Sequence, residues 1–166
     1  MTIKRLFLVS VCVLFSILSS AQGRYSTRLL ENGTMLFFNP CKLVAMQKET
    51  SLVYDMTYLT DSDSVTVNMT YTSQDLHVLE VRIVSGTATY QTANYSIFYR
   101  EKEKKGIATR IHISCPKNTY EDLFLSDTPM RIEIVSKEGG VRSFTYKKSK
   151  WVKERENILE AIALLK

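Results

Sequence analysis

The sequence lacks most of the features that assign a chemistry directly. It holds no run of 18 or more apolar residues, no Cys-x-x-Cys pair and no Gly-x-Ser-x-Gly motif, and only two histidines occur among its 166 residues. These absences argue against a membrane-spanning helix, a thioredoxin-like redox centre and the nucleophile elbow of serine hydrolases. No Cys/His spacing is typical of a zinc site.

The N-terminus has the three-part layout of a secretory signal peptide. Lys4 and Arg5 precede an apolar run over residues 6–18, and Ser19-Ser20-Ala21 supplies small residues before a cut at Gln22. The apolar run is short for the roughly 20 residues that span a bilayer as a helix. We therefore predict a signal peptide over 1–21 and an exported protein, periplasmic, cell-surface or secreted. The alternatives are an uncleaved N-terminal anchor and, through Cys12, a lipoprotein.

The predicted mature chain, 22–166, suits a single domain with a real hydrophobic core. Two of the 22 basic residues leave with the signal, so 20 basic residues face 17 acidic ones and the net charge is +3. This mild charge does not favour nucleic acid as a partner.

Two cysteines remain after the predicted cut, Cys41 and Cys115. In an oxidising compartment an isolated pair is a disulfide candidate. The alternative is two separate buried thiols, and spacing alone does not decide between them.

Period-2 apolar alternation, typical of half-buried strands, runs through most of the chain. Turn signals such as Asn32-Gly33, Ser85-Gly86 and Gly139-Gly140 separate the runs. About eight strands are predicted, at 34–38, 52–58, 65–71, 79–83, 95–99, 107–115, 130–134 and 141–146.

Two helices complete the prediction. One is short, near 119–126, and the other, about 150–165, carries Trp151 and Ile158 on one apolar stripe. The fold class is therefore mainly β, or α+β in the broad sense. We expect an antiparallel β-sandwich or a partly closed barrel with a C-terminal amphipathic helix.

Candidates for catalysis are few. His77 and His112 both lie in strand-like runs, and general acid-base chemistry would need a carboxylate such as Asp55 or Glu80 within reach of one of them. Asp61 and Asp63 are candidate calcium ligands, although the glycine and terminal glutamate of an EF-hand are missing. No other metal site and no cofactor is predicted.

Two surfaces are candidates for binding. Thr66, Asn68, Thr70 and Thr72 alternate along one face of a predicted strand, where they could meet a polar ligand or another sheet. Lys148, Lys150 and Lys153 surround Trp151 at the start of the last helix and could meet an anionic surface.

We therefore predict a non-catalytic binding or accessory domain of the cell envelope or secreted space, whose partner is an envelope protein or a glycan. One alternative is a small hydrolase or lyase acting on envelope polymer. The other is a structural subunit that completes a neighbouring sheet.

Overall fold

The computed structural model describes residues 24–46, 51–73, 77–104, 106–137 and 140–165. The predicted signal peptide lies outside these residues. The described residues form two helices, α2 (Lys117–Leu125) and α3 (Lys148–Ala163). The strands are β1 (Tyr25–Leu30), β2 (Gly33–Ala45), β3 (Ser51–Leu59), β4 (Ser64–Ser73), β5 (Val78–Ser85), β6 (Ala88–Thr92), β7 (Ser96–Glu103), β8 (Gly106–Pro116), β9 (Arg131–Ser136) and β10 (Gly140–Thr145).

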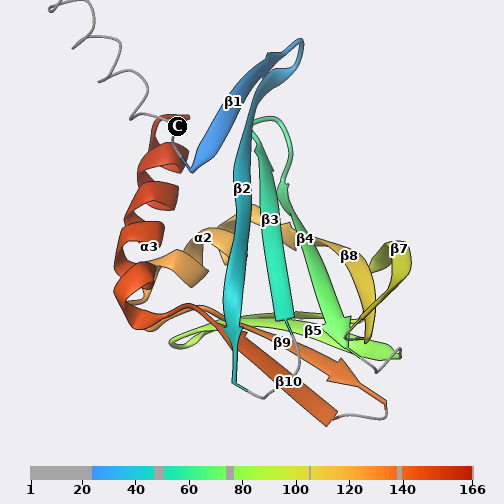
Figure 1. Cartoon of the computed structure of the whole chain (residues 1–166). Coiled ribbons are helices and arrows are strands. Elements are labelled where there is room, and N and C mark those ends of the chain that lie inside the picture. Colours follow the sequence, from blue (N-terminus) through green and yellow to red (C-terminus); the bar gives the residue numbers. More distant parts are fainter. Residues whose placement is uncertain (1–23, 47–50, 74–76, 105, 138–139, 166) are drawn as a thin grey trace, which may run out of the picture.

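All the strands join one antiparallel sheet that curls into a half-barrel. Nine follow the order β6-β5-β9-β10-β2-β3-β4-β8-β7, and β1 pairs with the first half of β2. The ladder between β10 and β2 holds only two residue pairs, so the sheet bends sharply there. Figure 1 shows the result: β5, β9 and β10 cross beneath the upright strands β2, β3 and β4. The predicted partly closed barrel is thus confirmed.

The core lies inside this curl and is closed by the helices. Alternate residues of β3, β4 and β8, among them Met56, Val67 and Ile111, are fully buried on the inner face. α2 contributes Phe124, which stacks on Trp151 of α3 with ring centroids 5.6 Å apart. The apolar stripe predicted for the last helix therefore packs on the protein's own core. Among the described residues, no helix has the length and hydropathy to span a bilayer.

Buried tyrosines make the interior partly polar. The hydroxyl groups of Tyr54 and Tyr146 hydrogen-bond each other, and among the described residues none partners the hydroxyl of Tyr120. Burial raises the pKa of all three phenols, so they stay protonated in the folded protein.

Three strands differ from the sequence prediction. Residues 25–30 form β1, although no strand is predicted over that stretch, and β6 likewise has no predicted counterpart. The strand predicted to end at Asn39-Pro40 continues to Ala45, because the register with β3 shifts between Phe38 and Cys41. A β-bulge tolerates proline, since the missing N–H leaves no ladder bond unmade there.

Both helices begin about two residues earlier than predicted, after Pro116 and Lys147, and neither N-cap side chain makes a capping bond.

The candidate disulfide between Cys41 and Cys115 is absent, and both thiols are free. Cys41 lies on β2 and Cys115 on β8, with β3 and β4 between them in the sheet. Adjacent strands lie about 4.8 Å apart, so the two Cα atoms are well beyond the roughly 7 Å that a disulfide can bridge. The alternative interpretation, two separate thiols, describes the structure.

The two thiols are expected to react at very different rates. Cys115 is fully buried, and desolvation raises the pKa of its thiol to about 12, whereas Cys41 is only half-buried. Because the thiolate is the nucleophile, iodoacetamide at pH 8 should alkylate Cys41 and leave Cys115 unmodified until the protein is unfolded. Peptide mass spectrometry resolves each cysteine. Equal labelling of both in the folded protein would contradict this placement.

Candidate ligand groove at the barrel seam

A row of four polar residues crosses the outer face of the sheet. Asp55 of β3 pairs with Asn68 of β4, Asn68 pairs with His112 of β8, and His112 pairs with Ser96 of β7. Direct cross-strand partners have Cβ atoms about 4.5–5.5 Å apart and share one face. We call this row, Asp55–Asn68–His112–Ser96, the polar rung.

Hydrogen bonds join the first three members of the polar rung. Asn68 Nδ2 donates to Asp55 Oδ1 at 2.9 Å, and His112 Nδ1 lies 3.2 Å from Asn68 Oδ1. Arg110, on the same face of β8, donates from Nη2 to Asp55 Oδ2 at 2.6 Å and from Nη1 to Thr70 Oγ1 at 3.2 Å. The side chain of Asp55 is only 2% exposed, so its charge is balanced almost wholly by these partners.

These bonds fix the tautomer of His112. An ionised carboxylate only accepts hydrogen bonds, so Asn68 must turn its amino group to Asp55 and its carbonyl oxygen to His112. Nδ1 of His112 must then carry a proton and donate it. In the neutral imidazole, Nε2 is left as a hydrogen-bond acceptor. No hydrogen bond to Nε2 occurs among the described residues.

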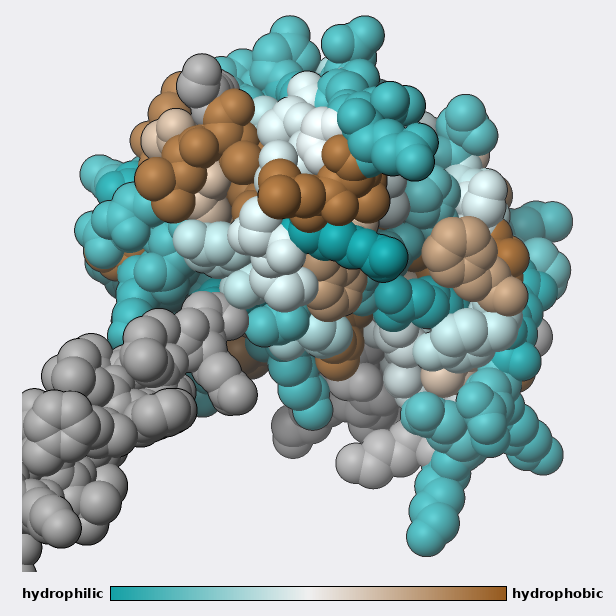
Figure 2. Space-filling model, turned by 90° about the horizontal axis from the view of Figure 1, so that it is seen from above, coloured by the Kyte–Doolittle hydropathy of each residue, from teal (hydrophilic) through white to brown (hydrophobic). Residues whose placement is uncertain are grey.

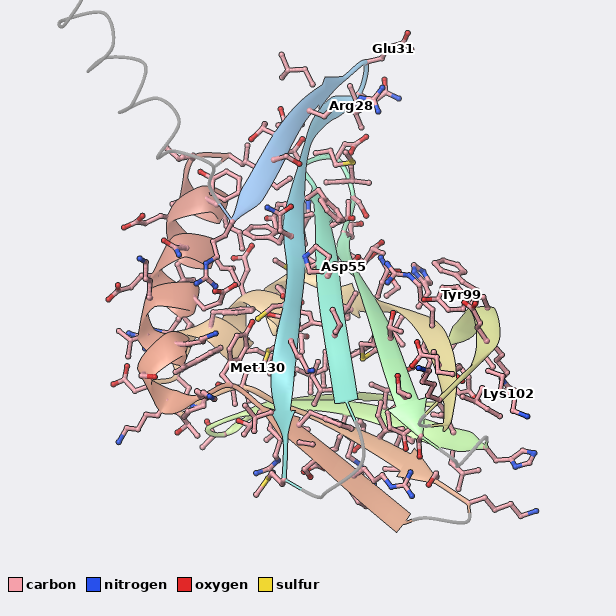
Figure 3. All side chains as sticks on the ribbon, viewed as in Figure 1. Arg28, Glu31, Asp55, Tyr99, Lys102 and Met130 are labelled. Atoms are coloured by element: carbon pink, nitrogen blue, oxygen red, sulfur yellow. The ribbon has the colours of Figure 1, made fainter. Side chains whose placement is uncertain are left out.

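The imidazole is also held from one side by an aromatic ring. Phe98 of β7 stacks on His112, with ring centroids 5.3 Å apart and planes at 30°. The register of β7 against β8 shifts between Ile97 and Tyr99, which marks a β-bulge at Phe98. Bulges redirect side chains, and this one brings Phe98 onto the outer face beside His112. Figure 3 labels Asp55 on β3 and Tyr99 on the edge strand β7, with β4 and β8 between these two strands in the sheet.

His112 and Ser96 line a groove between the two edge strands of the curled sheet, β6 and β7. We call the line along which these edges approach each other the seam. The groove has a volume of about 200 Å³. Its walls come from β6, from the β6–β7 connection and from β7 and β8. The lining residues include no carboxylate, lysine or arginine: they are Tyr90, Thr92, Asn94, Tyr95, Ser96, His112, Ile113 and Ser114.

Two tyrosine hydroxyls hold the seam in place of a strand ladder. Tyr90 of β6 donates to the carbonyl oxygen of Ser114 at 2.5 Å, and Tyr95 donates to the carbonyl oxygen of Val78 at 2.6 Å. Partial burial raises the pKa of Tyr90, which keeps its hydroxyl a donor. Two of the side chains that bound the groove, Tyr90 and Tyr95, are therefore held in place by hydrogen bonds.

The structure separates the predicted site residues into those that meet and those that do not. Asn68 and His112 lie in the polar rung, and Thr66 and Thr70 flank it on the same face opposite Ser114 and Arg110. Thr72 is buried next to Ala108. His77 is exposed just before β5, outside the rung and the groove lining, and Glu80 is paired with Arg82.

The other predicted sites stay dispersed. Asp61 and Asp63 lie in the turn between β3 and β4, and within the described ranges no three His, Cys, Asp or Glu side chains gather to hold a metal. Lys148, Lys150 and Lys153 are exposed on α3 around the buried Trp151. They can form a basic surface, but they do not line the seam groove.

Of the groove lining, the sequence analysis singled out only His112, and it also missed Arg110 and Phe98 beside that imidazole. Alternation along residues 107–115 does place Arg110 on the polar face beside His112, so that signal was present. The places of Ser96, Phe98 and Tyr90 depend on strand pairing and on a bulge, which no local pattern shows.

A second exposed surface lies at the tip of the hairpin formed by β1 and β2. Leu29 is 81% and Leu30 43% exposed there, and Figure 3 labels Arg28 and Glu31 beside them. Figure 2, viewed from above, shows hydrophobic patches interrupting the polar surface at this end of the molecule. The tip offers apolar contact area but no convergent polar groups.

Comparison of the chain with protein-family models, with curated proteins and with solved structures finds no significant match. The function has to be argued from the geometry of the groove.

Proposed function

We propose that this is an exported binding domain that takes a polar, uncharged ligand in the seam groove. The observation that carries the proposal is the held imidazole: Asp55 and Asn68 orient His112, which keeps Nε2 as an acceptor and lines a groove together with hydroxyl and amide groups. Small-molecule sites combine a concave surface with a few fixed polar groups that set orientation. The layout of residues 1–21 supports export.

The test is whether filling the groove abolishes binding. Ser114 is exposed and lines the groove, so Ser114→Trp should block it. The control is Lys102→Trp on the exposed β7 strand, outside the groove lining (Figure 3). Mixtures of neutral sugars, polyols, amides and nucleosides are screened by ¹H–¹⁵N shift perturbation. We expect shifts at groove residues that vanish in Ser114→Trp and persist in Lys102→Trp. Equal shifts in both variants would refute the proposal.

A second candidate function, hydrolysis of an envelope polymer, is favoured by one observation. The polar rung ends on Ser96, so a carboxylate, an amide, an imidazole and a hydroxyl follow one another across four strands. A hydrolase would use His112 as the base and Ser96 as the nucleophile. The described residues show no hydrogen bond between them, which favours binding over catalysis. A fluorophosphonate probe that labels Ser96 in the native protein, but not in His112→Gln, would reverse this preference.

A further inference from the structure

We propose that the ligand of the seam groove is a neutral sugar unit, held through a hydroxyl group that donates to Nε2 of His112. This inference rests on the proposed function and adds the chemical class of the ligand. The ring unit would belong to a glycan or occur as a free sugar, and the experiment below separates the two.

The first step is the polarity of the central contact. Asp55 sets the orientation of Asn68, and Asn68 sets the tautomer of His112, so neutral His112 presents an acceptor and no donor at Nε2. A ligand must therefore bring a donor. Hydroxyl and amide groups on the walls, from Thr92, Asn94 and Ser114, can both donate and accept. A ligand rich in hydroxyl groups matches both demands.

The second step is charge and shape. The groove lining includes no carboxylate, lysine or arginine to compensate a charged ligand. Tyr90 and Tyr95 supply aromatic surface for the apolar face of a ring. A volume of about 200 Å³ has room for one sugar ring.

The experiment titrates the purified protein with glucose, galactose, mannose and N-acetylglucosamine, and with their methyl glycosides, at pH 8. We expect at least one of these sugars to bind. His112→Gln should lower the affinity for that sugar about tenfold. His77→Gln, the control at the exposed histidine, should leave the affinity unchanged. Stronger binding of a methyl glycoside than of the free sugar indicates a glycan.

Two further readouts test the contact itself. A deoxyfluoro analogue keeps the acceptor and loses the donor, so replacing the hydroxyl that reaches Nε2 should abolish binding. Long-range ¹H–¹⁵N spectra should show the Nδ1–H tautomer of His112 in the free protein. The inference is overturned if no sugar binds, or if sugars bind equally well in His112→Gln. If the groove residues respond to another neutral ligand and Ser114→Trp abolishes that response, the proposed function stands although the sugar inference fails.

Discussion

Replacing Trp151 with alanine is expected to lower the free energy of unfolding by about 3–5 kcal/mol, the range for a large aromatic side chain lost from a core. Trp151 is 1% exposed and lies between Phe124 and Tyr146, with ring centroids 5.6 and 5.2 Å away. Its Nε1 donates to the carbonyl oxygen of Ser126 at 3.3 Å, which ties α3 to the end of α2. Truncation leaves a cavity and one carbonyl without its partner.

The matched control is the next residue along the helix. Val152 is 49% exposed, so Val152→Ala should change the stability by less than about 0.5 kcal/mol. Urea unfolding followed by circular dichroism gives both midpoints with a common slope. A loss below 1 kcal/mol for Trp151→Ala would mean that α3 does not close the core in solution.

The strands that the sequence predicts best are those with one solvent-exposed face and one buried face. Along β4, Val65, Val67 and Met69 are buried, while Thr66, Asn68 and Thr70 are partly exposed on the opposite face. Period-2 alternation describes this strand as far as Tyr71. The side of the sheet on which Asn68 and His112 lie was therefore available from the sequence.

The strands that the sequence does not predict lack this difference in burial between their two faces. β1 is exposed along nearly its whole length, and β6 is short and alternates only between partial and full exposure. Their place in the sheet is set by pairing, to β2 and to β5, and not by burial of their own side chains. A polar strand on an exposed arm looks like a loop in the sequence.

The polar rung depends on a register that no local pattern contains. From Glu103 to Tyr99, β7 pairs with β8 in one register, and beyond the bulge at Phe98 it pairs one residue out of step. Without this shift, Ile97 and not Ser96 would face His112. A single-residue slip exchanges the two faces of a strand, so the composition of the groove follows from one bulge.

Replacing Asp55 with alanine is expected to destabilise the fold by about 3 kcal/mol, because a nearly buried charge pair loses one partner. Arg110 is 26% exposed, so it can regain part of its hydration, which keeps the loss at the lower end of the range for broken buried pairs. Asn68 loses its acceptor as well. The second consequence is chemical: with no carboxylate to orient Asn68, the amide can flip, and His112 is free to take up the Nε2–H tautomer.

An exposed ion pair provides the comparison. Asp127 pairs with Arg155, but the Asp127 side chain is 93% exposed, so Asp127→Ala should cost no more than about 1 kcal/mol. Urea unfolding measures the two losses, and ¹⁵N spectra of His112 in both variants measure the tautomer. Loss of the Nδ1–H form in Asp55→Ala alone is the expected result. The two roles of Asp55 depend on different atoms, since Oδ2 accepts from Arg110 and Oδ1 accepts from Asn68. If Asp55→Ala unfolds easily yet keeps the Nδ1–H tautomer, Asp55 stabilises the sheet without setting the tautomer of His112.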